Sequence, residues 1–318
     1  MGVGDRARGR RDVSARSGRA CGGDRRRTVT TVRDVLELVR APAALTVLGD
    51  TAVGAHAASG GFGRRGWLLP LASAAIYSGG MALNDWADRD VDAVERPERP
   101  IPSGRVRPKQ ALAVAAACGV AGLALAAAGG GRRSLAVAVP LVAAVVAYDV
   151  VAKPTAAGPL VMAACRALDV MMGARGSSRA LPAALTIGTH TAGVTALSRG
   201  EVHGGSAAEV GTALAATGAA AASVDGVAPS VQTPLARAAG AAGAAGYLVS
   251  ALPSQLAAAD DPSPARVRDA TRTGIGSVVP LQAALVARSG SLAVALGLTA
   301  LDGARRLLMA RRRAGDVT

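Results

Sequence analysis

Three aspartates near the end of an apolar stretch are spaced so that one helix would present them together. Asp85, Asp88 and Asp92 stand at positions i, i+3 and i+7, which at 100° per residue places them within an arc of roughly 60°. Asn84 flanks this acidic face, and Asp90 would point to the opposite side. Like charges on one helix face repel each other, so the pattern favours a bound cation. Mg²⁺ takes oxygen ligands and commonly bridges one or two carboxylates to substrate phosphates.

The segment that follows the acidic face alternates arginines with prolines. Arg96 and Arg99 are interspersed with three prolines, Pro97, Pro100 and Pro102. Proline breaks helices, so we expect a rigid loop that caps a cavity. The two guanidinium groups would either stabilise an anionic leaving group or pair with Asp90 and Glu95.

The composition predicts an all-α, polytopic membrane protein. The chain has 318 residues, 50% of them hydrophobic, with a mean hydropathy of +0.32. Its Ala- and Gly-rich apolar runs are about long enough to cross a bilayer and suit close helix packing. We expect nine or ten transmembrane helices around a central cavity. The expected spans are at about 36–57, 66–87, 108–130, 134–152, 156–174, 181–198, 207–224, 233–252, 270–288 and 291–310.

The net charge of +14 is concentrated in a few segments. Residues 1–28 contain nine Arg and three Asp, and Arg311–Arg313 form a second cluster near the other end. Such tails can bind nucleic acid, but cytoplasmic flanks of membrane helices explain them better. We therefore expect no nucleic-acid partner, a basic, disordered cytoplasmic tail over residues 1–33, and a single membrane domain over 34–318.

The same charge bias orients the helices. It places the link at 88–107 in the cytoplasm, and with ten spans rather than nine it places Arg311–Arg313 there too. We expect an integral plasma-membrane protein whose acidic face opens to the cytoplasm. Four arginines fall on the opposite side and run against the bias: Arg132, Arg133, Arg175 and Arg179.

Ionisable residues also occur deep within the expected spans, where a charge is costly. Arg166 and Asp169 are three residues apart, so we expect them to pair. Asp50 and His190 would either line a pocket or form internal hydrogen bonds.

Two aromatic residues flank the acidic helix in a chain with only 2% aromatic residues. Tyr77 and Trp86 would either pack against their neighbours or stabilise a carbocation by cation–π contact. We expect packing.

The segment 84–105 resembles the first signature of the UbiA family of intramembrane prenyltransferases. It reads Asn-Asp-x-x-Asp-x-x-x-Asp and continues, from Arg96, as Arg-Pro-x-Arg-Pro-Ile-Pro-Ser-Gly-Arg. The resemblance extends over the helical layout from about residue 34 onward. It implies Mg²⁺-dependent transfer of an isoprenyl chain from an allylic diphosphate to an acceptor within the membrane. It also implies that Asp85, Asp88 and Asp92 bind the metal while Asn84 assists the diphosphate.

Two further segments are interpreted through this resemblance. Tyr148 and Lys153 are similar to a family element whose cation contacts diphosphate, so we expect them at the substrate; alternatively, Lys153 only reaches the membrane surface. The link near residue 200 lacks the family's second aspartate motif. It offers Arg199 for the diphosphate, and Glu201 and His203 as a metal ligand or general base.

This altered second motif resembles a divergent branch of the family, of the type encoded with Ebo gene clusters. The expected partners are a prenyl diphosphate, membrane lipid and an acceptor, aromatic or lipid, whose identity the sequence does not give. The altered motif also leaves two other functions open. One is a membrane transport protein on the same scaffold that binds without forming a bond, and the other is a structural membrane subunit with no ligand.

Overall fold

The computed structural model describes residues 30–40, 43–227 and 233–315. The tail expected over 1–33 therefore lies almost entirely outside the described residues. The side chains of Arg311–Arg313 lie outside them as well.

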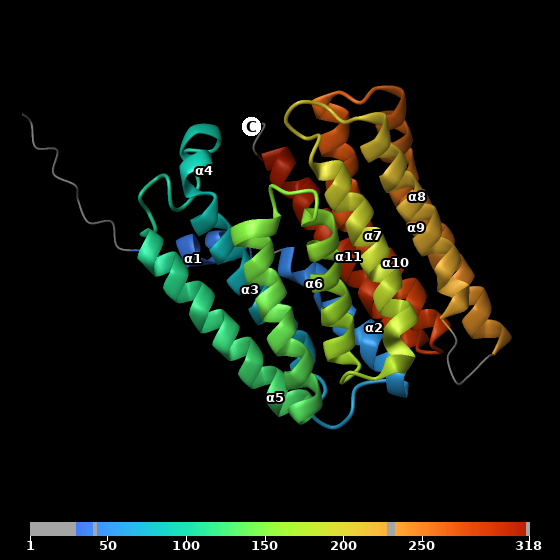
Figure 1. The fold of residues 1–318 in the computed structure, drawn as a ribbon. Coiled ribbons are helices and arrows are strands. Elements are labelled where there is room, and N and C mark those ends of the chain that lie inside the picture. The colour runs from blue at the N-terminus through green and yellow to red at the C-terminus, as the bar shows by residue number, and fades with distance from the viewer. Residues whose placement is uncertain (1–29, 41–42, 228–232, 316–318) are drawn as a thin grey trace, which may run out of the picture.

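The described residues are organised as a helical bundle without strands, which confirms the predicted all-α class (Figure 1). Short 3₁₀ or π segments lie at 43–46, 148–152 and 178–180. The α-helices are α1 (Val32–Leu38), α2 (Leu48–Ser59), α3 (Leu68–Ala87), α4 (Arg89–Glu95), α5 (Pro108–Ala147), α6 (Gly158–Gly173), α7 (Leu181–Ser198), α8 (Ala207–Gly226), α9 (Pro234–Asp260), α10 (Pro264–Arg288) and α11 (Leu292–Gly315).

Nine of the ten predicted spans each correspond to one helix or half-helix. The third and fourth spans form the two antiparallel arms of α5, which reverses direction at Gly131 (φ 67°, ψ −159°). This left-handed conformation suits glycine because it has no Cβ. Three segments are long and apolar enough to cross a bilayer by length and composition: 108–152, 207–226 and 234–260. The number of membrane crossings stays a prediction.

The first predicted span, 36–57, is broken in the structure. Helix α1 ends before Arg40, which has a positive φ of 48°, and the regular helix α2 begins only at Leu48. The left-handed conformation is costly for a residue with a side chain, and proline follows at position 42. The hydropathy of this stretch gave no sign of the break, because apolar residues continue on both sides of it.

The ends of the helices define two ends of the bundle. The acidic end contains α4 and the links at 88–107, 148–157 and 199–206, whereas the opposite end contains the links at 60–67, 129–133 and 174–180. One buried core joins α10 to α2, α6, α7, α8, α9 and α11, and a second joins α3, α5 and α6.

Close helix contacts depend on glycine at several crossings. At the crossing of α2 and α6, a Cβ on Gly54 would lie 1.9 Å from the carbonyl oxygen of Val170. A Cβ on Gly173 would lie 2.3 Å from the carbonyl oxygen of Thr51. This crossing fixes the depth at which α2 begins, next to the cavity described below.

We predict that Gly173→Ala destabilises the protein by about 1–3 kcal/mol, because the added methyl group forces α2 and α6 apart. Gly218 on α8 is the matched control, since a Cβ there would meet nothing within 4 Å. Gly218→Ala should leave stability unchanged or raise it by about 0.5–1 kcal/mol. Thermal unfolding in detergent measures both, and equal midpoints for the two variants would contradict the packing account.

Candidate active site

A cavity of about 400 Å³ opens among α3, α5, α6, α7 and α10. Its mouth lies at the acidic end, where charged side chains gather, and its body is mainly apolar. The apolar lining comes from Ile76, Met81, Leu141, Val145, Met162, Val194, Ile275 and Val278. The cavity thus joins a charged entrance to an apolar interior.

Two of the three aspartates share one cation at this mouth. The chain stays nearly helical across the junction of α3 and α4, with Asp92 N donating to the Asp88 carbonyl at 2.8 Å. Asp85 and Asp92 are almost fully buried, and Nη1 of Arg99 lies 3.3 Å from the first and 2.5 Å from the second. Asp90 instead points outward, is 83% exposed and pairs with Arg89, as its position in the sequence predicted.

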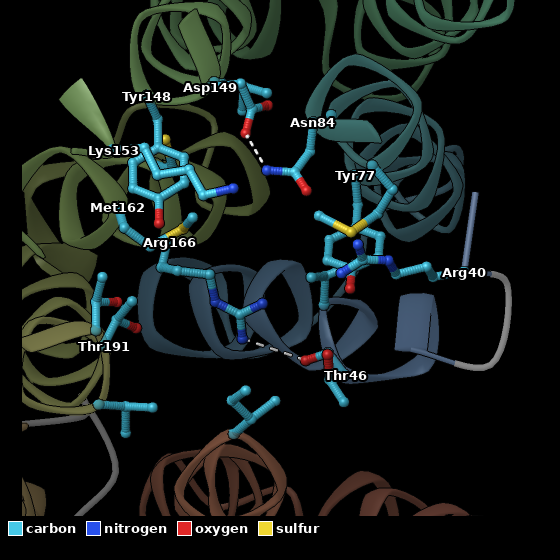
Figure 2. A pocket seen from close by; sticks show the side chains of 18 of the residues that line it. Arg40, Thr46, Tyr77, Asn84, Tyr148, Asp149, Lys153, Met162, Arg166 and Thr191 are labelled. Carbon is cyan, nitrogen blue, oxygen red and sulfur yellow. Dashed lines mark hydrogen bonds between the residues drawn. The ribbon is translucent and has the colours of Figure 1, made fainter. Parts of the chain in front are cut away.

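The third aspartate faces a different cation. Asp88 forms an ion pair with Lys153, which directly follows the π-helical turn at 148–152. Nearby, Asn84 donates to Asp149 at 3.2 Å. Figure 2 shows Lys153 and Asn84 directed towards the same space, with Tyr148 beside them. Tyr148 and Lys153 therefore lie beside the aspartate segment, while their role at the substrate stays a prediction.

The arginines at 96 and 99 pair with the buried aspartates rather than with Asp90 and Glu95. Arg96 lies 3.8 Å from Asp92, while Arg99 bridges the two buried carboxylates. The alternative pairing considered from the sequence is wrong. Short-range pairing with exposed acids gains little in water, whereas buried carboxylates need a partner.

Arg40 is a site residue that the sequence reasoning missed. Its Nη2 lies 3.0 Å from Asp85, and its side chain lines the cavity beside Tyr77 (Figure 2). The break between α1 and α2 puts it there, since a continuous span would have carried it past the acidic face. Pro42 was the available signal, because a proline within an apolar helical pattern breaks the helix.

A buried ion pair lies deeper in the bundle. Nε of Arg166 is 2.9 Å from Asp50, which is fully buried and also accepts from Gln282 at 2.7 Å. The predicted pair of Arg166 with Asp169 is wrong, because Arg166 pairs with Asp50 on α2. It also donates to the Thr46 carbonyl at 3.2 Å (Figure 2). Asp169 instead accepts from Ser73 at 2.5 Å. Asp50, without Arg166, would be a buried charge with no counter-ion.

His190 combines both roles considered for it. It lines the cavity, and its Nδ1 lies 2.7 Å from the hydroxyl of Tyr247. Tyr77 also lines the cavity, whereas Trp86 packs against the buried cluster around Leu38, with Arg89 5.1 Å from its ring centre. The prediction that both residues only pack against their neighbours thus holds for Trp86, whereas Tyr77 also faces the cavity.

The link between α7 and α8 stands at the edge of the cavity rather than within it. Arg199 donates to the Thr155 carbonyl at 2.6 Å, and Arg268 donates to the Glu201 carbonyl at 2.7 Å. Burial raises the pKa of Glu201, against the opposing influence of nearby arginines such as Arg96 and Arg268. His203 is exposed. Among the described residues, no three His, Cys, Asp or Glu side chains form a preassembled metal cluster.

Helix α1 is held onto the acidic end by one arginine. Arg105 lies 2.8 Å from Asp34 and 2.7 Å from Glu37. Asp34 also accepts from Thr31 in a capping box. Hydrogen bonds from Thr31 and Arg105 lower the pKa of Asp34 to about 2. This anchor holds the segment that carries Arg40.

Curated relatives match parts of the chain. Digeranylgeranylglyceryl phosphate synthase of Methanopyrus kandleri is 43% identical over 100 residues, covering 30% of this chain and 35% of the relative. The enzyme of that name from Methanothrix thermoacetophila is 55% identical over 47 residues, covering 15% and 18%. The chain thus spans about a third or less of the curated relatives it matches.

Solved structures match more of the fold. A UbiA homolog from Aeropyrum pernix K1 covers 76% of this chain and 96% of its own, at 19% identity and a TM-score of 0.63. A UbiA homolog from Archaeoglobus fulgidus, bound to DMAPP and Mg²⁺, covers 78% and 98%, at 16% identity and a TM-score of 0.59. These likenesses concern the fold alone.

The fold and the cavity define a helical, membrane-embedded protein with an acidic entrance to an apolar chamber. The model of the UbiA prenyltransferase family matches residues 47–198, which include the aspartates, the arginine loop and Lys153. Within these residues the chain is similar to the UbiA prenyltransferase family, and the resemblance found in the sequence is confirmed. Its place in the Ebo-type branch stays a prediction.

We predict that acid weakens the attachment of α1 through Asp34. Its folded pKa of about 2 lies below its ordinary value of 3.8. The stabilising contribution is therefore complete above pH 3.8 and is lost as the pH falls towards 2. Unfolding midpoints between pH 5 and pH 2 in detergent should fall more steeply for the unmodified protein than for Asp34→Asn. Parallel curves would contradict the assignment.

We predict that Arg166→Met destabilises the protein by about 3–5 kcal/mol, because it leaves Asp50 buried without a counter-ion. Arg166→Met combined with Asp50→Asn should recover most of that loss, since the amide oxygen still accepts from Gln282. Denaturation of both variants in the same detergent measures the difference. A double variant as unstable as the single one would show that the ion pair is not the cause.

Proposed function

We propose that this protein transfers an isoprenyl group from an allylic diphosphate to an acceptor within the membrane, with Mg²⁺. One observation carries the proposal: a mainly apolar cavity whose entrance is built from alternating carboxylates and cations. Such an entrance fits a metal-bound diphosphate, and the interior fits a hydrocarbon chain.

The donor set fits Mg²⁺. Asp85, Asp88 and Asp92 supply oxygen ligands of the kind that Mg²⁺ takes together with substrate phosphates. A positive nitrogen of Arg99 already lies between Asp85 and Asp92, so a cation is accommodated at that point. The bound Mg²⁺ would supply Lewis-acid stabilisation of the departing diphosphate. We assign these aspartates as metal ligands and Asn84 as a hydrogen-bond partner of the diphosphate.

The cations at the entrance would then exchange partners. Lys153, Arg96, Arg99 and Arg40 neutralise carboxylates in the structure. With Mg²⁺ held by the carboxylates, the ammonium and guanidinium groups would be free to turn to the diphosphate oxygens, where arginine forms strong paired hydrogen bonds. As the carbon–oxygen bond breaks, the diphosphate leaves with the electron pair, and these cations stabilise the charge that develops on it.

The interior of the cavity would hold the isoprenyl chain. Its apolar walls exclude water from the allylic cation, while the acceptor forms the new bond to the allylic carbon and gives up a proton to the departing diphosphate. Tyr77 and Tyr148 line the cavity near its entrance and are placed to face that cation. Arg199 and Glu201 lie outside the lining, at the rim, and would contact only the outer part of a bound substrate.

The acceptor is aromatic or lipid in this proposal. The curated relatives are named for the synthesis of digeranylgeranylglyceryl phosphate, which supports a lipid acceptor. The helices that could cross a bilayer support an integral membrane protein. We further propose that residues 34–318 act as one domain in the plasma membrane, with the acidic end towards the cytoplasm as the charge bias predicts.

We predict that Asp88→Asn lowers prenyl transfer by roughly 100-fold or more, because one charge that holds the metal and orders Lys153 is lost. Asp90→Asn is the matched control, since Asp90 is 83% exposed and pairs only with Arg89. Turnover of a labelled prenyl diphosphate by membranes that contain each variant measures the effect. Equal turnover by the Asp88 and Asp90 variants would reject the metal assignment.

The same assay distinguishes prenyl transfer from transport. The link at 199–206 favours transport, because it lacks a second acidic motif. Transfer releases diphosphate in proportion to the new product. A transport protein would move the prenyl compound across sealed vesicles without any diphosphate release. Transport without release would replace the proposed function.

A further inference from the structure

The opposite end of the bundle carries six arginines in three glycine-rich links. The links at 60–67, 129–133 and 174–180 contain no Asp or Glu. Their arginines are Arg64, Arg65, Arg132, Arg133, Arg175 and Arg179. In the described part of the chain, none of these six forms an ion pair. The surface is therefore strongly positive without internal compensation.

This positive surface runs against the charge bias of membrane proteins. With the acidic end towards the cytoplasm, these links fall on the side where arginine is normally scarce. Four of the six arginines stood out for this reason in the sequence itself. A bound anionic ligand at this end would explain why these arginines are present.

A second cavity, of about 650 Å³, lies where the three links meet. Arg133 stands on one wall and Arg175 on another, with the hydroxyl-bearing Ser177 and Ser178 beside them. Small residues form much of the remaining lining: Ala55, Ala58, Gly61, Gly63, Gly66, Ala136, Gly173, Ala174 and Gly176. The cavity thus brings two guanidinium groups and two hydroxyls around an open space.

Arg175 is held in place at the centre of these links. Its φ of 53° lies in the left-handed region, which costs energy for a residue with a side chain. Its Nη2 donates to the Gly129 carbonyl at 3.3 Å, and a Cβ on Gly63 would lie only 3.1 Å from the same nitrogen. A guanidinium has five N–H donors, so most of the donors of Arg175 remain available to a ligand.

We propose that this second cavity binds the phosphate group of an anionic membrane lipid. Guanidinium groups form paired hydrogen bonds with phosphate oxygens, and the absence of acids from the three links favours an anion. The links lie at the ends of apolar helices, where lipid headgroups are found. The site is remote from the acidic end, so it does not depend on the proposed prenyl transfer.

Trp67 provides a local reporter for the test. It adjoins the cavity-lining Gly66, is 59% exposed, and shares the chain with only one other tryptophan, Trp86. In the Trp86→Phe protein, reconstituted in phosphatidylcholine bilayers, brominated phosphatidylglycerol should quench Trp67 more than brominated phosphatidylcholine at the same mole fraction. Arg133→Gln with Arg175→Gln should remove this preference.

Two comparisons keep the test decisive. Arg64→Gln with Arg179→Gln removes the same charge from the same end but outside the cavity lining, and should keep the preference. Arg133→Gln alone, at an exposed position, should weaken the preference even if the double variant fails to fold. Equal loss in the Arg64 and Arg179 variant would overturn the proposal in favour of general surface charge.

The source of the phosphate is tested in the same samples. Preferential quenching that persists in millimolar inorganic phosphate supports a lipid headgroup. Loss of the preference in inorganic phosphate would show a site for free phosphate and would overturn the assignment to lipid. Equal quenching by the two brominated lipids in the unmodified cavity would overturn it as well.

Discussion

Charge compensation inside an apolar bundle is the constraint on which this structure depends. A buried carboxylate without a partner is strongly destabilising in such surroundings. The bundle meets this requirement by pairing Asp85 and Asp92 with Arg99, Asp88 with Lys153 and Asp50 with Arg166. The Asp88–Lys153 and Asp50–Arg166 pairs join segments far apart in the chain, so the contacts that neutralise charge there also hold the walls of the cavity together.

At the acidic end, the proposed function would require these ion pairs to exchange partners. The carboxylates stay neutralised by arginine and lysine, and the incoming metal and diphosphate would each take over one side of the existing pairs. The Arg166–Asp50 pair has no such exchange open to it, because Asp50 is fully buried and also bound by Gln282. One network is therefore suited to binding substrate, and the other to holding α2 against α6.

The sequence predicted the helices well because hydropathy and turn residues act locally. Nine spans, the reversal at Gly131 and the outward position of Asp90 follow from such local rules. It missed Arg40 and mispaired Arg166, because both depend on where distant helices lie in space. The break before α2 is masked by apolar residues, and an i, i+3 spacing on α6 cannot reveal a stronger partner on α2.

The central claim is that the buried aspartates hold a metal together with a diphosphate. Equilibrium binding of an unreactive prenyl thiolodiphosphate to the purified protein, measured with Mg²⁺ and with a chelator, tests it most directly. We expect Mg²⁺ to tighten binding by at least roughly tenfold, or about 1.4 kcal/mol. Without Mg²⁺ the carboxylates should repel the diphosphate, so binding of equal strength in the chelator would contradict the account.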